Sequence, residues 1–131
     1  MLRFKFSAQT LGLTLPYGLE EIGAIVDKVI ALSHLPEASV KIVLTGGLSA
    51  DQFTPENQGS LIVFAYPLKP PPHHCYTQGI DVITSSHMRC MPTSKTTNYL
   101  PAMMALKSGS MEALYLNAAQ ELLEGTTSNF F

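Results

Sequence analysis

The chain has 131 residues, of which 46% are hydrophobic and 14% are charged. This composition predicts a folded chain with a real core and excludes an intrinsically disordered one. With 8 Lys and Arg against 10 Asp and Glu, the net charge of -2 gives no general attraction to nucleic acid or to anionic membranes. No apolar run approaches the ~20 residues that span a bilayer. The charge and the lack of a long apolar run predict no nucleic-acid or membrane partner. Two cysteines are too few for a disulfide framework and the N-terminus lacks a signal peptide, so a cytoplasmic protein is expected.

The first part of the chain has the pattern of two helices followed by two strands. Helices are expected over residues 2–12 and 19–33, the second because apolar residues recur in it at spacings of three and four. Strands are expected over residues 40–45 and 61–66, and the second is continuously apolar, which is typical of a buried strand. The loop between the two strands would let them pair as neighbours.

Three consecutive prolines, residues 70–72, cannot lie inside a helix or a central strand and favour an extended polyproline conformation. They predict a linker over residues 69–78, between a first part at 1–68 and a second part at 79–131.

The second part alternates strands with one helix. A strand is expected over residues 79–84 and a helix over 99–107, with Pro101 tolerated in its first turn. A hairpin of strands 112–116 and 120–124 would follow, and residues 125–128 would turn into a further strand. Helices and strands together predict an α/β fold.

Lys95 precedes a predicted helix start and stands among small hydroxyl residues in the run PTSKTTN. The positive end of a helix dipole disfavours a second positive charge, which favours a partly neutral amine. A Schiff-base nucleophile needs such an amine. A solvated surface lysine is the alternative interpretation.

A second polar cluster follows the last predicted hairpin. Glu124 and Gly125 are succeeded by the hydroxyl residues Thr126, Thr127 and Ser128. The glycine permits close backbone approach, and the hydroxyl and amide groups offer donors to a polar ligand. The alternative is a hairpin end with an exposed Glu. Elsewhere, His73, His74 and Cys75 are adjacent on an extended segment and point in opposite directions, so no metal site is expected there.

The two clusters together resemble the class IV aminotransferases, pyridoxal-phosphate enzymes that include branched-chain amino acid aminotransferase, D-amino acid aminotransferase and aminodeoxychorismate lyase. The matching segments are RCMPTSKTTNYL (89–100), EALYL (112–116) and LEGTTSNF (123–130), in the family's order and approximate spacing. Upstream segments at 2–16 and 44–51 are similar to the family's phosphate-arginine helix and to a strand and loop of its small domain. The resemblance therefore covers nearly the whole chain.

The resemblance implies a role for individual residues. Lys95 would bind pyridoxal 5'-phosphate as a Schiff base and move the proton during transfer. Glu124 would pair with the pyridine nitrogen and keep it protonated, so that the ring accepts electrons. Arg3 would bind the phosphate and Tyr99 would approach the phenolic oxygen of the cofactor. The wall of the cofactor site would be lined by Thr126, Thr127 and Ser128, whereas Arg89 and Pro92 are expected to be structural.

The resemblance also implies a two-domain fold that is incomplete at both ends, because the family's chains are about twice as long. Residues 1–68 would be the C-terminal part of the small α/β domain, and residues 79–131 the first part of the cofactor-binding domain. The helix between Asn98 and Glu112 is shorter than is usual in the family.

The expected reaction transfers an amino group between an L-amino acid and a 2-oxo acid. The segment KTTNYL at 95–100 is most similar to branched-chain members of the family and favours branched-chain substrates. The resemblance also implies a homodimer for the full-length parent. D-amino acid transamination and the lyase step that makes 4-aminobenzoate are alternatives on the same fold. Gly46 disfavours the first of these, because D-amino acid enzymes carry an arginine in that turn. A non-catalytic truncated product is an alternative of another class, and the isolated chain is expected to be weakly active or inactive.

Overall fold

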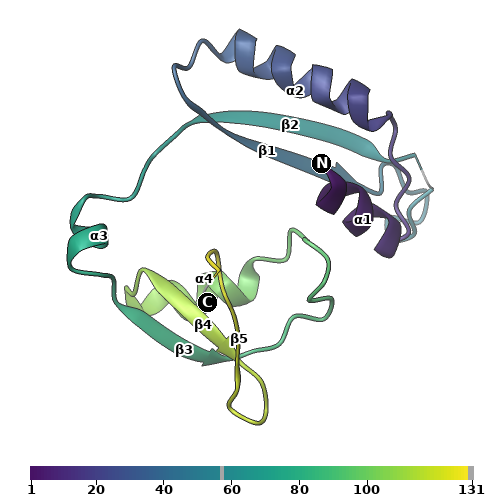
Figure 1. The fold of residues 1–131 in the computed structure, drawn as a ribbon. Coiled ribbons are helices and arrows are strands. Elements are labelled where there is room, and N and C mark those ends of the chain that lie inside the picture. The colour runs from purple at the N-terminus through teal and green to yellow at the C-terminus, as the bar shows by residue number, and fades with distance from the viewer. Residues whose placement is uncertain (57, 130–131) are drawn as a thin grey trace. The chain divides into compact units, whose positions relative to one another are not determined.

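The computed structural model describes residues 1–56 and 58–129 and divides into two compact units (Figure 1). The first unit contains residues 1–69 together with the short segment 93–95. The second unit contains residues 70–92 and the described residues from Thr96 onward. Both units combine helices with strands, so the predicted α/β class is confirmed.

The first unit consists of two helices and a two-stranded antiparallel sheet (Figure 1). Its elements are α1 (Leu2–Thr10), α2 (Leu19–Ser33), β1 (Ala38–Thr45) and β2 (Ser60–Pro67). The register places Ala38 opposite Pro67 and Thr45 opposite Ser60. Helix α2 packs on the sheet and buries Ile22 completely.

Helix α2 has the predicted bounds because both of its ends are specified locally. At the start, the Gly18 amide donates a 2.9 Å hydrogen bond to Oε2 of Glu21. The acidic side chains of the first turn also interact favourably with the helix dipole. At the end, His34 adopts a left-handed conformation with φ 53°, and Pro36 prevents the helix from continuing.

The prediction that the strand at residues 61–66 is buried is wrong for the described chain. Leu61, Val63 and Ala65 are partly buried, whereas the alternate residues Ile62, Phe64 and Tyr66 are exposed. Side chains of a strand point alternately to opposite faces, so only one face of this sheet is covered by the described residues.

The second unit is built on a three-stranded sheet in the order β3-β4-β5. Its elements are α3 (His74–Thr77), β3 (Val82–Ser86), α4 (Leu100–Ala105), the 3-10 helix η1 (Leu106–Ser108), β4 (Glu112–Leu116) and β5 (Leu122–Gly125). Strands β3 and β4 are parallel, and the connection between them carries α4; β4 and β5 are antiparallel. Ala113 and Tyr115 of the central strand are almost fully buried.

Several boundaries in this unit differ from the sequence-based expectation. One helical turn, α3, interrupts the segment that was expected to be extended. Strand β3 begins at Val82 rather than at residue 79, because Gly79 has a positive φ of 82° and pairing with β4 begins at Val82. The hairpin turn is where it was predicted, and Oδ1 of Asn117 accepts hydrogen bonds from the amides of Ala119 and Glu121.

The strand expected after Gly125 is absent over residues 126–129, and its continuation at 130–131 lies outside the described residues. Across the part of the chain that the structure describes, every helix is too short or too polar to cross a membrane.

Candidate functional site

Glu124 is held at the end of the sheet by an ion pair. It lies on β5 directly opposite Tyr115 of β4, so the two side chains project from the same face. The Nε atom of Arg89, which follows β3, lies 3.0 Å from Oε1 of Glu124. Both side chains keep partial contact with solvent.

Arg89 is fixed by more than its ion pair. Its Nη2 atom donates a 3.2 Å hydrogen bond to the carbonyl oxygen of Thr126, and its guanidinium carbon lies 5.8 Å from the centre of the Tyr115 ring. The ring of His87 also contacts the Tyr115 ring edge-on, with 4.8 Å between the ring centres. A planar guanidinium bonded at two nitrogens has little rotational freedom, so it orients the carboxylate with which it pairs.

Tyr115 is only 2% exposed. Burial raises the pKa of its phenol, and the negative charges of Glu124 and Glu112 act in the same direction, whereas Arg89 opposes them. The phenol therefore remains neutral over the physiological range.

The segment after Glu124 is tied to a buried carboxylate, Glu112, at the start of β4. Oε1 of Glu112 accepts hydrogen bonds from the amide of Thr126 at 3.0 Å and from the hydroxyl of the same residue. Oε2 accepts from the amide of Thr127 at 3.2 Å and from its hydroxyl at 2.8 Å. The hydroxyl of Ser128 and the amide of Ala113 also donate to this carboxylate.

These hydrogen bonds decide the charge of Glu112. Burial alone would raise its pKa, but donation by Thr126, Ser128, Ala113 and Thr127 outweighs burial and lowers the pKa from 4.5 to about 2. Glu112 is therefore a buried anion at neutral pH, balanced by donors rather than by a cation.

Gly125 is required by the path of the chain at this point. A Cβ atom there would lie 2.6 Å from the carbonyl oxygen of Ser128 and 2.7 Å from its hydroxyl. The close backbone approach expected of this glycine is made by the chain itself, which folds back immediately after β5.

Lys95 belongs to the first unit, in an irregular segment ahead of α4. Its side chain is exposed, and its amide donates a 3.0 Å hydrogen bond to the hydroxyl of the buried Ser7. Arg3 precedes Ser7 by four residues on α1, so both lie on the same side of that helix. The structure thus brings the backbone of Lys95 to the side of α1 that carries Arg3.

Ser94, next to Lys95, is 2% exposed, and its hydroxyl has no hydrogen-bond partner among the residues that the structure describes. A buried polar group without a partner is rare and costly, and such groups mark sites of strain or of ligand contact.

Tyr99 caps the N-terminus of α4 in the second unit and is partly buried. The predicted residues Glu124, Thr126, Thr127 and Ser128 are gathered in the second unit, whereas Arg3 and Lys95 are in the first. Within the described ranges, no group of three His, Cys, Asp or Glu side chains could hold a metal ion.

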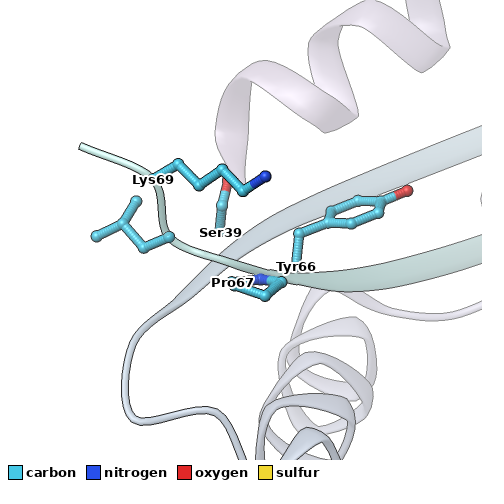
Figure 2. Close-up of a pocket in the computed structure, with 5 residues that line it drawn as sticks. Ser39, Tyr66, Pro67 and Lys69 are labelled. Atoms are coloured by element: carbon cyan, nitrogen blue, oxygen red, sulfur yellow. The ribbon is translucent and has the colours of Figure 1, made fainter. Parts of the chain in front are cut away.

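The first unit also contains a pocket (Figure 2). It is lined by Ser39, Tyr66, Pro67, Leu68 and Lys69, none of which was predicted as a site residue. Lys69 is the charged residue of this lining, and Figure 2 shows its side chain together with those of Ser39, Tyr66 and Pro67.

Sequence reasoning missed one residue of the site, Glu112, and one contact, the ion pair of Arg89 with Glu124. Glu112 was seen only as part of a strand motif, and Arg89 was expected to be structural. An acidic residue that begins an otherwise apolar strand was a usable signal for Glu112, since a charge at a core position needs partners. The pairing of Arg89 with Glu124 had no signal, because 34 intervening residues separate them.

The sequence profile of the family described as amino-transferase class IV matches residues 1–131. The chain belongs to the class IV aminotransferases. This result confirms the family recognised from the segments around Lys95 and Glu124.

A curated relative is the Methanocaldococcus jannaschii protein named "Putative branched-chain-amino-acid aminotransferase", which is 28% identical over 134 residues. The alignment covers 95% of this chain and 46% of the relative. The chain therefore spans about half the length of the curated relative it matches.

Two solved structures share the fold. The first, from Legionella pneumophila subsp. pneumophila str. Philadelphia 1, is named "Putative 4-amino-4-deoxychorismate lyase"; it has a TM-score of 0.80 and 22% identity. The second is a branched-chain amino acid aminotransferase with pyridoxamine 5'-phosphate, from the organism abbreviated T.th., with a TM-score of 0.79 and 21% identity. Each match covers 95% of this chain, and 48% and 45% of the respective structures. These likenesses confirm the expected class IV aminotransferase fold.

Proposed function

We propose that the protein catalyses pyridoxal-phosphate-dependent transamination between an L-amino acid, preferably of the branched-chain type, and a 2-oxo acid. The observation that carries this proposal is the orientation of Glu124 by Arg89 within a chain of this family. Arg89 bonds to Oε1 of Glu124. Among the described residues, Oε2 has no hydrogen-bond donor, so it is available to a ligand N–H.

The residues present fit the cofactor that the family implies. Glu124 offers a carboxylate for a protonated pyridine nitrogen, Lys95 an exposed primary amine, and Arg3 a guanidinium for a phosphate. The buried hydroxyl of Ser94, which lacks a partner among the described residues, is an independent indication that a polar group approaches beside Lys95.

When bound, pyridoxal phosphate supplies an electron sink for the charge that develops at Cα of the amino acid. Nζ of Lys95 would hold the cofactor covalently, and the same amine, once the amino group of the substrate has displaced it, would take the proton from Cα and return it. Oε2 of Glu124 would keep the proton on the pyridine nitrogen. Arg3 would bind the phosphate, and Tyr99 would approach the phenolic oxygen.

The wall of the cofactor site would be lined by Thr126, Thr127 and Ser128, but the two threonines have few hydrogen-bond donors left for a ligand. The amides and hydroxyls of both threonines already donate to Glu112. What these two residues still offer to a ligand is therefore acceptor capacity and shape, while their donors serve to hold the segment in place.

Borohydride reduction tests the site. The protein, expressed with the whole of its natural coding sequence, is incubated with pyridoxal phosphate, reduced and mapped by peptide mass spectrometry. We expect the label on Lys95, and Lys95→Ala should abolish it. Lys107→Ala, which removes another exposed lysine, is the matched control and should leave the label unchanged. A label on any other lysine contradicts the assignment of Lys95.

Product assays test the reaction and its substrate. We expect amino transfer from L-leucine, L-isoleucine or L-valine to 2-oxoglutarate. Transfer only from D-amino acids would replace the proposal with D-amino acid transamination. Formation of 4-aminobenzoate from aminodeoxychorismate would replace it with the lyase reaction. Labelling of Lys95 without turnover of any of these substrates would favour a non-catalytic product.

The proposal includes a homodimer, since sites of this family are completed across two subunits. Light scattering of the same preparation should give twice the mass of one chain. A monomer that turns over substrate would contradict this part of the proposal.

A further inference from the structure

Glu112 is a buried titratable group that the proposed reaction does not use. It is 4% exposed and sits at the first position of β4. No cation pairs with it among the described residues, and its donors are amides and hydroxyls concentrated in the segment 126–128. A buried carboxylate satisfied in this way fixes the conformation of the backbone that surrounds it.

The bonds to Thr126 are the most constrained part of this arrangement. Both the amide and the hydroxyl of Thr126 donate to Oε1 of Glu112. The same amide also donates to the carbonyl of Ala113 at 2.9 Å. The carbonyl of Thr126 belongs to the next peptide group, whose N–H is that of Thr127 and donates to Oε2 of Glu112 at 3.2 Å. Both peptide groups that flank Thr126 are therefore held by Glu112, and neither can rotate without breaking hydrogen bonds.

The carbonyl of Thr126 is bonded to Arg89. It accepts the 3.2 Å bond from Nη2, and Nε of the same guanidinium pairs with Glu124 at 3.0 Å. A continuous series of contacts therefore runs from Glu112 through Thr126 and Arg89 to Glu124. All four residues lie within the second unit.

We infer that Glu112 is a positioning residue, which fixes Thr126 and, through Arg89, sets the direction of the Glu124 carboxylate toward the cofactor nitrogen. The part that concerns the cofactor rests on the proposed function. The part that concerns the segment 126–128 stands on the hydrogen bonds alone. Glu112 does not touch the reacting atoms, so its effect on the reaction is indirect.

The test compares Glu112→Gln with Glu121→Gln. Both remove one negative charge from the same hairpin, and Glu121 also holds a hydrogen bond, 2.6 Å from Nδ2 of Asn117. In Glu112→Gln, the amide NH₂ would face donors, so several bonds are lost. We expect at least tenfold weaker pyridoxal phosphate binding, a changed pH midpoint of cofactor absorbance, and at least tenfold faster amide exchange at Thr126 and Thr127. Glu121→Gln should stay within twofold of the unsubstituted protein in all three.

A double-mutant cycle with Arg89→Met tests the route. If Glu112 acts through Arg89, the effect of Glu112→Gln on cofactor affinity should shrink to less than threefold once Arg89 is absent. Additive effects would overturn the inference that Glu112 orients Glu124 through Arg89. An unchanged affinity and absorbance midpoint in folded Glu112→Gln would also overturn it, because general destabilisation does not shift the spectrum.

Failure of the proposed function is distinguishable from failure of this inference. If the unsubstituted protein binds no pyridoxal phosphate, the function is wrong, and amide exchange still decides whether Glu112 holds Thr126. If Glu112→Gln does not fold, Thr127→Val removes only one hydroxyl donor to the same carboxylate. Faster exchange at Thr126 in that variant supports the inference, and unchanged exchange overturns it.

Discussion

Arg89 and Glu124 form an ion pair in which Nε lies 3.0 Å from Oε1. Arg89 follows β3 and Glu124 lies on β5, and 34 residues separate them in the sequence. The pair leaves Oε2 of Glu124 without a donor among the described residues. An ion pair that uses one oxygen and leaves the other open fits a carboxylate that is oriented for a second partner, rather than one that serves only to hold the fold together.

Replacing Arg89 should therefore affect cofactor binding more than stability. We expect Arg89→Met to weaken pyridoxal phosphate binding by about tenfold, while the free energy of unfolding falls by only about 1 kcal/mol, since the pair is partly exposed. Arg89→Lys should be intermediate, because an ammonium group cannot bond to Glu124 and to the Thr126 carbonyl in the geometry of a planar fork. Equilibrium titration with the cofactor and urea unfolding measure the two effects.

Lys107→Met is the matched control for the loss of a positive charge, since Lys107 is exposed on η1. It should change the cofactor dissociation constant by less than twofold. Equal losses of affinity in Arg89→Met and Lys107→Met would show a general charge effect and contradict the role of Arg89.

Ser7 should control the local order around Lys95. Its hydroxyl accepts the amide of Lys95 at 3.0 Å, and Ser7 is 5% exposed. Ser7→Ala leaves that amide without its acceptor, at a cost of about 1–2 kcal/mol. We expect faster hydrogen exchange at Lys95 and slower borohydride labelling, with Ser39→Ala, an exposed serine of β1, as the control. Unchanged exchange at Lys95 would mean that this bond does not hold the segment.

The parts of the fold that could be predicted are those specified by local sequence. The bounds of α2 follow from Glu21, from the apolar spacing and from Pro36, all within or beside one helix. The turn at Asn117 follows from a side chain that bonds to its own neighbours. The start of β3 could not be predicted, because it is set by pairing with β4, about 30 residues later.

The same distinction holds in the site. The segments around Lys95 and Glu124 could be recognised because their residue types are contiguous. Glu112 and Thr126 are separated by 13 residues, and they meet only because β4 and β5 form a hairpin. The exposed face of β2 was mispredicted for a related reason: a continuous apolar run shows that a strand can be buried, but not whether both faces are covered by the described residues.

Gly125 should not tolerate a side chain. The Cβ of Gly125→Ala would lie 2.6 Å from the carbonyl oxygen of Ser128, which requires the backbone to move. We expect a loss of about 1–3 kcal/mol in the free energy of unfolding. Gly23→Ala, in the middle of α2 with no atom within 4 Å of the added Cβ, should instead stabilise by about 0.5–1 kcal/mol. Thermal or urea unfolding distinguishes the two signs, and a neutral Gly125→Ala would contradict the tight turn.

The acid sensitivity of the fold should depend on Glu112. Its pKa is lowered from 4.5 to about 2 in the folded chain, so unfolding brings a carboxylate that binds protons more readily. The stabilisation, roughly 3 kcal/mol, is present above pH 5 and is lost as the pH falls toward 2. Glu112→Gln should therefore flatten the dependence of the unfolding free energy on pH between 5 and 2, as measured by urea unfolding at several pH values.

Asp51 provides the control for this prediction. Hydrogen bonds from Thr54, Phe53 and Ser49 hold the pKa of this exposed carboxyl well below its usual range, so it contributes acid sensitivity of the same sign. Glu112→Gln should leave that contribution, and Asp51→Asn should leave the contribution of Glu112. Because Asp51 belongs to the first unit and Glu112 to the second, the two substitutions should act additively. An unchanged pH slope in folded Glu112→Gln would contradict a buried, ionised Glu112.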